Sequence, residues 1–485
     1  MTQRIRAVSA VIALLCASDA SAQWTTSQLQ VPRYGHAAAA TDTAAYFAGG
    51  YRQFGLLGSV DVVDRQGVVQ PPLQLSVARA RLAAASDGDR VYFAGGIVAS
   101  TQCVTDLVEI YDESTGTWQI THMPIPVSHV AGIALPGMVV FAGGTSGCIT
   151  NAQAVAQVYD VASGTWSVVD LRTPGRAIIA AAADDRWICL AGGGGVPPAN
   201  RVLNVYDSLT DSWSAHIIPQ LHEGQGIAIM DGKLYLYAID RLAIFDLAER
   251  TWDFADLPTY RPFAFGASVG PYVVFANGAT GQFGVSHDTA DVLNVHTGIW
   301  RTVSLGVAAR DRAAVTCGES IFIAGGTEGN GGAFIASTID IMTVDLALGR
   351  PYCGPAVSNS QGHPANIRAH GSSAVLENYL TLVLEGAPIG SAGMFLVSAA
   401  AAGGVVPPGA QGPICLGNPL GRIGASVGAV GVDGILAHEV DLLGLPFVPN
   451  IAVAPGETWH FQAWYRDSNP GPTTNLSDAI AVLFR

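Results

Sequence analysis

The sequence is poor in positive charge, and Lys233 is its only lysine among 485 residues. The formal net charge is −14 and no basic tract occurs, which argues against binding to nucleic acid or to an anionic membrane surface. Charged residues make up only 13% of the chain, whereas 49% of the residues are hydrophobic and 57 are glycine. Because disordered chains have the opposite composition, we expect a packed protein rich in strands and turns.

Long apolar runs are also missing. The longest candidate, "MFLVSAAAAGGVVPPGA" over 394–410, is broken by glycine and proline, so it does not reach the roughly 20 apolar residues of a membrane helix. The N-terminus combines Arg4 and Arg6 with a short apolar stretch over 8–17 and the small residues of 20–22. This pattern predicts a signal peptide over residues 1–22, and hence a secreted or cell-surface protein without a membrane span.

Cysteine is sparse, and Cys16 belongs to the predicted signal peptide. The six remaining cysteines of an exported protein could pair in several ways. Position suggests two disulfides, which join Cys103 to Cys148 and Cys353 to Cys415. Cys189 lies within an apolar strand and Cys317 beside a turn, so both are predicted to be unpaired.

What the sequence has in abundance is one phrase, an apolar strand that ends in two glycines, as in "RVYFAGG" over 90–96. The double glycines stand at 49–50, 95–96, 143–144, 192–193 and 325–326, and weaker copies occur at 234–240 and 272–278. A second phrase such as "VYD" and then a tryptophan follow most copies, at Trp118, Trp166, Trp213, Trp252 and Trp300. Regular internal spacing of this kind indicates a repeat architecture.

Each repeat is predicted to form four short strands separated by turns. Such units are typical of β-propeller blades, so we predict an all-β chain with a seven-bladed propeller over 23–349. Six blades would follow if the weak fifth repeat were incomplete. The seventh repeat has no tryptophan, and Trp24 has no repeat of its own. The N-terminal segment is therefore expected to supply the outermost strand of the last blade. Glycine at the end of each second strand should admit a neighbouring backbone.

The order Gly-Gly, Tyr, Trp resembles the kelch-repeat family over residues 24–349, although the repeats at 222–252 and 263–300 lack the double glycine. The resemblance implies a kelch-type β-propeller. It extends to galactose oxidase, which places such a propeller before a C-terminal β-domain. That enzyme family holds copper with two tyrosines and two histidines, one Tyr and one His being adjacent, and no Tyr-His dipeptide occurs here. We therefore expect no copper, and no other metal or cofactor.

The period ends near residue 350. Segments such as "YLTLVLEGA" and "TWHFQAWYR" lie between glycine- and proline-rich turns, which predicts an antiparallel β-sandwich over 350–485. The stretches "CLGNPLGRIG" and "PGETWHFQAWYRDSNPGP" resemble a C-terminal module of secreted proteins from planctomycete-type bacteria. That resemblance implies an extracellular or cell-surface setting.

Basic residues recur in the loops that lead into the first strand of each repeat. In a four-strand meander these loops emerge on one face, where a propeller can bind a ligand. We predict a ligand-binding set of Arg79, Arg81, His129, Arg176, Arg261, Arg310 and Arg312. Arginines spread over several blades suit a carboxylate, sulfate or phosphate. The alternative, which the sequence leaves open and which the residue types favour, is that each arginine binds carbonyls or an acid inside the propeller.

Two loops carry weaker chemical signals. The resemblance extends to kelch-type sialic-acid epimerases, which need an acid–base residue near arginines, and His222 with Glu223 would fill that role. The stretch "VSHDTAD" groups His287, Asp288 and Asp291, which could hold a divalent cation. Solvated turns are the alternative in both places.

No glycine-rich phosphate loop followed by lysine occurs, nor a His-Glu-x-x-His stretch. The sequence therefore favours an exported, non-catalytic binding or scaffold protein that uses one propeller face to bind a carbohydrate or an extracellular or cell-surface protein. The competing hypothesis is a carbohydrate-active enzyme, epimerase-like through His222 and Glu223 or, less favoured, a copper-radical oxidase.

Overall fold

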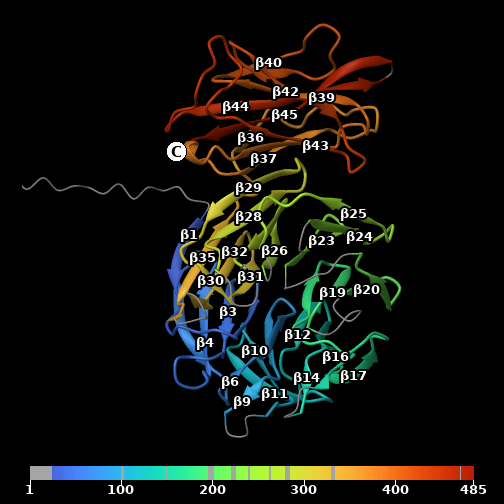
Figure 1. Ribbon diagram of the computed structural model, residues 1–485. Helices are drawn as coiled ribbons and strands as arrows, with labels where there is room; N and C mark the ends of the chain where they lie inside the picture. Colours follow the sequence, from blue (N-terminus) through green and yellow to red (C-terminus); the bar gives the residue numbers. More distant parts are fainter. Residues whose placement is uncertain are drawn as a thin grey trace, which may run out of the picture. The chain divides into compact units, whose positions relative to one another are not determined.

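The computed structural model describes residues 24–99, 103–147, 151–194, 201–219, 226–238, 241–261, 264–278, 285–328, 334–469 and 471–485. The predicted signal peptide, residues 1–22, lies outside these ranges. Regular structure in the described residues consists of β-strands and one 3₁₀ turn, η2 (Val375–Glu377), so the all-β prediction is confirmed (Figure 1). The chain divides into two compact units, residues 23–347 with 431–438, and residues 348–430 with 439–485.

The described part of the first unit contains seven four-stranded antiparallel sheets, each built mostly from consecutive strands. The first three sheets are β2 (Ala37–Ala40), β3 (Ala44–Ala48), β4 (Ser59–Asp64) and β5 (Val69–Gln74); β7 (Ala83–Ser86), β8 (Arg90–Ala94), β10 (Leu107–Asp112) and β11 (Thr117–His122); and β12 (Ala131–Leu135), β13 (Met138–Ala142), β16 (Val155–Asp160) and β17 (Thr165–Asp170). The next two are β18 (Ala180–Ala183), β19 (Trp187–Ala191), β20 (Val202–Asp207) and β21 (Ser212–Ile217); and β22 (Ile227–Met230), β23 (Lys233–Tyr237), β24 (Leu242–Asp246) and β25 (Trp252–Ala255).

The sixth sheet contains β26 (Phe265–Val269), β27 (Tyr272–Ala276), β28 (Thr289–Asn294) and β29 (Ile299–Ser304). The seventh contains β31 (Ala313–Cys317), β32 (Ser320–Ala324), β35 (Thr338–Thr343) and, as its outer strand, β1 (Trp24–Gln28). In this sheet Trp24 pairs with Met342 and Gln28 with Thr338. The predicted contribution of the N-terminal segment to the last sheet is confirmed. Short strands join the loops: β6 (Arg79–Ala80), β9 (Ile97–Val98), β14 (Thr145–Ser146), β15 (Asn151–Ala152), β30 (Ala309–Arg310), β33 (Thr327–Glu328) and β34 (Phe334–Ile335).

The first strands of the seven sheets contact one another in cyclic order, β2 to β7, β12, β18, β22, β26, β31 and back to β2. These strands are short and rich in alanine, because little room is left where they converge. The second strands, such as β3 and β27, are buried at every position, since a neighbouring sheet covers each of their two faces. The fifth repeat, which lacks the double glycine, nevertheless forms a four-stranded sheet.

Double glycines join several sheets to the next sheet. The Gly50 N–H donates to the Arg79 carbonyl at 2.8 Å, and the Gly326 N–H donates to the Arg33 carbonyl at the same distance, which links the seventh sheet to the first. Gly50 has a φ of +98°, and a Cβ there would lie 2.8 Å from the Tyr34 carbonyl oxygen. Glycine is needed because the backbones approach this closely.

Aromatic rings fill the outer part of the spaces between sheets. Between the first and second sheets, the Tyr111 ring lies 5.0 Å from the Trp118 ring and 6.1 Å from the Tyr46 ring. Tyr159 repeats this arrangement between the second and third sheets, 5.0 Å from Trp166 and 6.0 Å from Tyr92. The "VYD" and tryptophan phrases of the sequence are therefore packing motifs.

The C-terminal unit contains two larger sheets and a small one. The five-stranded sheet has the order β36 (Arg350–Tyr352), β45 (Pro472–Leu483), β44 (Thr458–Ser468), β39 (Ala392–Ser398) and β42 (Gly421–Ala429), and a second sheet pairs β37 (Asn366–Gly371) with β38 (Leu380–Glu385). Strand β43 (Ile435–Val440) includes the boundary between the two units at residues 438 and 439. A two-stranded sheet pairs β40 (Ala401–Val405) with β41 (Ile414–Leu416). Strand β37 contacts β44 and β45, so the two larger sheets share a core.

A disulfide joins Cys353 to Cys415, as predicted. Cys189 and Cys317 are buried and free, also as predicted. The predicted partner of Cys103, Cys148, lies outside the described residues. A disulfide is consistent with an extracellular protein. Within the part of the chain that the structure describes, no helical segment has the length and apolar character that crossing a bilayer requires.

Candidate functional site

The loops that lead into the first strands share one backbone feature. Gly35, Arg81, His129, Ile178 and Asp311 occupy matching positions and all have φ between +52° and +58°. Three of their N–H groups donate to the carbonyl of the counterpart in the preceding sheet: Arg81 to Gly35 at 2.8 Å, His129 to Arg81 at 2.9 Å, and Ile178 to His129 at 3.0 Å. We call these five residues the collar. Backbone hydrogen bonds link four of them, Gly35, Arg81, His129 and Ile178, and the residue type differs from sheet to sheet.

Three collar side chains that reach the surface differ in chemical type. Ile178 is 46% exposed, Asp311 is exposed, and Arg81 is half-buried with its guanidinium 5.9 Å from the centre of the Tyr51 ring. No described residue forms a hydrogen bond or an ion pair with the Arg81 side chain. The collar therefore presents a cation, an apolar group and a carboxylate.

His129 is the titratable member of the collar. Its Nδ1 lies 3.1 Å from Ser128 Oγ. Burial, and to a smaller degree the charge of Arg81, lower the pKa of His129 to about 4. The imidazole is therefore neutral at neutral pH and can offer a donor and an acceptor.

Five arginines of the same loops point into the sheets instead. Each is at most 1% exposed and binds the polar residue at the third position of the third strand in its own sheet. The pairs are Arg33–Asp61 at 3.0 Å, Arg79–Glu109 at 2.5 Å, Arg261–Asp291 at 2.8 Å, Arg312–Asp340 at 2.6 Å, and Arg176 with Asn204. The same guanidiniums also donate to backbone carbonyls; Arg79, for example, reaches Gly95 and Leu107, both at 2.9 Å.

These bonds decide between the two roles that the sequence left open for four predicted ligand contacts. Arg79, Arg176, Arg261 and Arg312 occupy the internal role, because most of their N–H groups donate to carbonyl, carboxylate or amide oxygens inside the propeller unit. The Nε atoms of Arg79 and Arg312 are buried without a partner among the described residues. A buried guanidinium without such partners would be costly. Burial lowers the pKa of Arg79 and Arg312, and the paired acid opposes that shift in each case.

We call the buried arginine and its polar partner on the third strand the clamp. The residues at these two positions differ from sheet to sheet. In the third sheet Val127 takes the arginine position, and the neutral Gln157 takes the acid position and bonds to the Ile125 backbone at 2.7 Å and 3.1 Å. In the fourth sheet Arg176 faces the neutral Asn204, and burial lowers the pKa of Arg176 to about 10. The arginine remains charged, but no described acid compensates its desolvation.

The acid partners of the arginines were not predicted from the sequence, although a signal exists. The third strands read "SVDVVD", "LVEIYD", "VLNVYD", "TADVLN" and "TIDIMT", with one polar residue three positions before the terminal polar residue. A polar residue at that fixed place in an otherwise apolar buried strand predicts an internal partner.

The remaining predicted site residues have these positions. Arg310 is half-buried beside the collar residue Asp311. His222 and Glu223, the proposed acid–base pair, lie outside the described residues. The Asp291 carboxylate of the suggested cation loop accepts hydrogen bonds from Arg261 and Thr302. Among the described residues, no group of three or more His, Cys, Asp or Glu is placed to hold a metal ion.

One comparison with known protein families agrees with the repeat. The Kelch motif matches residues 78–120, which run from the start of the second sheet into β11. This match supports the kelch resemblance. No curated protein matches the chain. One solved structure, titled "Structure of YjhT", is similar at 15% identity with a TM-score of 0.45, and the match covers 64% of this chain and 95% of that chain.

Proposed function

We propose that the mature chain is an exported, non-catalytic binding or scaffold protein. Its residues 23–349 would form a seven-bladed kelch-type propeller and residues 350–485 a β-sandwich module of the kind found on secreted bacterial proteins. The collar face binds a carbohydrate or an extracellular or cell-surface protein. The seven sheets and the cyclic contacts of their first strands support the blade count.

The observation that carries this proposal is the collar itself. Four of its backbones, from Gly35 to Ile178, are bonded from sheet to sheet, while its five residues are a glycine, an arginine, a histidine, an isoleucine and an aspartate. A rigid frame that carries varied side chains is suited to recognition, because little ordering entropy is lost when a partner binds. Because four of the predicted ligand-binding arginines are buried, we limit the predicted set to Arg81, His129 and Arg310. We add the collar residues Ile178 and Asp311.

A glycan array and a pull-down with extracellular proteins test the proposal. The purified mature chain is compared with a collar variant, R81A/I178A/D311A, and with R422A, which removes one exposed arginine from β42 of the C-terminal unit. We expect the collar variant to lose at least about tenfold in affinity, which corresponds to about 1.4 kcal/mol. Its midpoint of thermal unfolding should stay close to that of R422A.

Two results would overturn the proposal. Binding that survives in the collar variant would remove the collar from the binding face. Turnover of a bound sugar that is lost in E223A would instead favour the enzymatic alternative.

A further inference from the structure

The space between the fifth and sixth sheets differs from the spaces between the first three sheets. In the second and third sheets, a third-strand tyrosine, Tyr111 or Tyr159, pairs with the tryptophan of the next strand and fills the gap to the preceding sheet. In the sixth sheet, Leu293 holds this position opposite Trp300. Leucine is shorter than tyrosine and lacks its hydroxyl, so the gap is not filled.

A second change at the same interface removes a hydrogen-bond partner. The Trp166 indole N–H donates to Thr121 Oγ1 of the preceding sheet at 3.1 Å. The residue that corresponds to Thr121 in the fifth sheet is Ala255, three positions after Trp252. The Trp300 indole N–H therefore has no partner among the described residues.

A third change leaves the hydroxyl of a largely buried tyrosine without a partner among the described residues. In the second sheet, the Tyr92 hydroxyl donates to Asp87 of the preceding turn at 2.8 Å. Tyr235 holds the position of Tyr92 in the fifth sheet, but its turn acid, Asp231, lies 3.0 Å from His296 Nε2 instead. Tyr235 is only 6% exposed, and no described residue forms a hydrogen bond with its hydroxyl.

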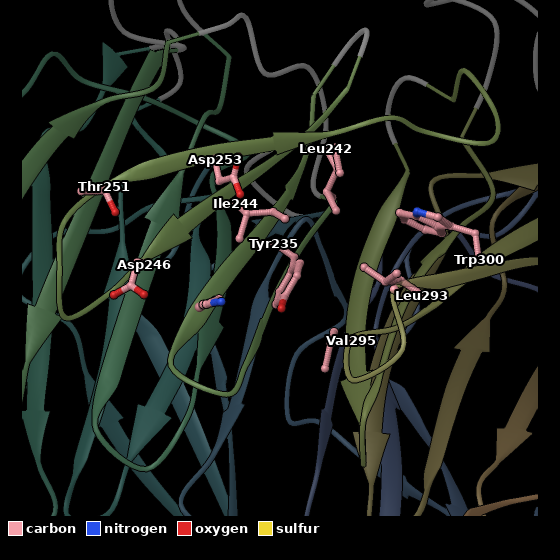
Figure 2. Close-up of a pocket in the computed structure, with 12 residues that line it drawn as sticks. Tyr235, Leu242, Ile244, Asp246, Thr251, Asp253, Leu293, Val295 and Trp300 are labelled. Carbon is pink, nitrogen blue, oxygen red and sulfur yellow. The ribbon is translucent and has the colours of Figure 1, made fainter. Parts of the chain in front are cut away.

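These changes coincide with a cavity of about 380 Å³ between β23, β24 and β25 on one side and β28 and β29 on the other. Figure 2 shows the Tyr235 ring between Ile244 and Leu293, and Trp300 across the cavity from Leu242. Its volume lies within the range of about 300–1,000 Å³ that is usual for small-molecule sites.

The polar groups at the cavity are mixed in kind. Asp246 and Asp253 line it, as does Lys233. One oxygen of each carboxylate accepts backbone N–H groups, for Asp246 from Ala248 at 3.0 Å and Glu249 at 2.8 Å, and for Asp253 from Phe254 at 2.8 Å. The other oxygen of each is left to accept from a ligand, while the indole N–H and the phenol can donate.

We propose that this cavity, which we call the intersheet pocket, is a binding site for one neutral sugar ring. Hydroxyl groups both donate and accept, which matches the mixed polar groups, and the C–H face of a sugar suits the walls formed by Tyr235, Leu293 and Trp300. Two carboxylates against one ammonium disfavour an acidic sugar. The site is separate from the collar and does not depend on the function proposed for it.

Isothermal titration calorimetry of the mature chain tests the intersheet pocket. The probes are glucose, galactose, mannose and N-acetylglucosamine, with glucuronic acid and glucosamine as charged counterparts. We expect saturable binding of at least one neutral sugar and weaker binding of glucuronic acid. The variant L293Y restores the tyrosine of the other sheets, so it should fill the cavity and weaken binding at least about tenfold. A255T should weaken binding less, because it only occupies the indole N–H.

The collar variant R81A/I178A/D311A is the matched control and should bind the sugar as the unchanged chain does. Since L293Y follows the packing of the other sheets, its unfolding midpoint should not fall. Absence of binding by all four neutral sugars would overturn the proposal. Unchanged binding in L293Y would do the same, and binding of glucosamine alone would show an amine site instead.

Discussion

The second and fifth sheets each contain four antiparallel strands, but they differ in the residues that hold the strands together and join each sheet to its neighbours. The second sheet has the double glycine, the buried Arg79–Glu109 pair and Thr121 as partner for the next tryptophan. The fifth sheet has no double glycine, and Ala243 stands where the second sheet has its acid. The fold therefore tolerates the loss of the double glycine, the buried acid and the threonine partner in one sheet, provided that the apolar strands remain. What changes is the interface, which opens into the intersheet pocket.

The largest expected effect breaks the clamp of the second sheet. R79M removes the guanidinium and leaves Glu109 buried without its partner, so the free energy of unfolding should fall by about 3–5 kcal/mol. Urea denaturation followed by tryptophan fluorescence measures this loss. The double variant R79M/E109L, which buries no lone charge, should recover most of it. A loss below about 1 kcal/mol in R79M would contradict the clamp.

A smaller loss of stability is expected when the interface between the first two sheets is made to resemble the interface at the intersheet pocket. Y111L removes the ring that packs on Trp118 and Tyr46, and should lower the free energy of unfolding by about 1–2 kcal/mol while opening a cavity between the first two sheets. A crystal structure and urea denaturation check the two outcomes. The reciprocal variant L293Y should raise stability; if both variants destabilise equally, the two positions are not equivalent.

The fourth sheet is intermediate, because it has the arginine but not the acid. N204D gives Arg176 a carboxylate partner and should stabilise the chain by about 1 kcal/mol after the cost of burying the new charge. The arginine should depress the pKa of the new carboxyl group in the folded state. The gain is therefore present above the unfolded pKa of about 3.9 and is lost as the pH falls through the folded pKa. Thermal unfolding at pH 7 and at pH 3 measures it, and the same gain at both values would refute the ion pair.

The smallest effect concerns the collar. The folded pKa of His129 is about 4, below the value of about 6.5 expected after unfolding. Between these values the unfolded chain binds the proton and the folded chain does not, so stability falls as the pH drops from 6.5 towards 4. Because His129 is partly exposed, we expect a contribution of only about 1 kcal/mol or less. H129Q should reduce the stability difference between pH 7 and pH 5 by that amount, measured by urea denaturation, whereas an equal difference in both proteins would exclude His129.

Local sequence patterns were sufficient for the strands and their order. The strand ending in Gly-Gly marks five of the seven sheets and the tryptophan also marks five, because buried strands must be apolar and close backbones require glycine. The position of Trp24 before the first repeat was enough to predict its pairing in the seventh sheet. The unpaired state of Cys189 was predicted from its place within an apolar strand, and that of Cys317 from its place beside a turn.

The arrangement of the arginines and of the collar was harder to predict from the sequence. The arginines recur in the correct loops, but the direction of their side chains depends on an acid about 30 residues further along the chain, as between Arg79 and Glu109. The collar depends on left-handed backbone at Arg81, His129 and Ile178, residue types that do not announce that conformation.

By itself the sequence determined that this protein is all-β, is built from repeats and uses its N-terminal strand in the last repeat, and it suggested the Cys353–Cys415 pair, because these properties follow from local patterns and residue positions. Only the tertiary structure decided which basic groups face inward and where an interface is left open. Those outcomes depend on residues from different strands and neighbouring sheets meeting in space, as Leu293 and Ala255 do around Trp300.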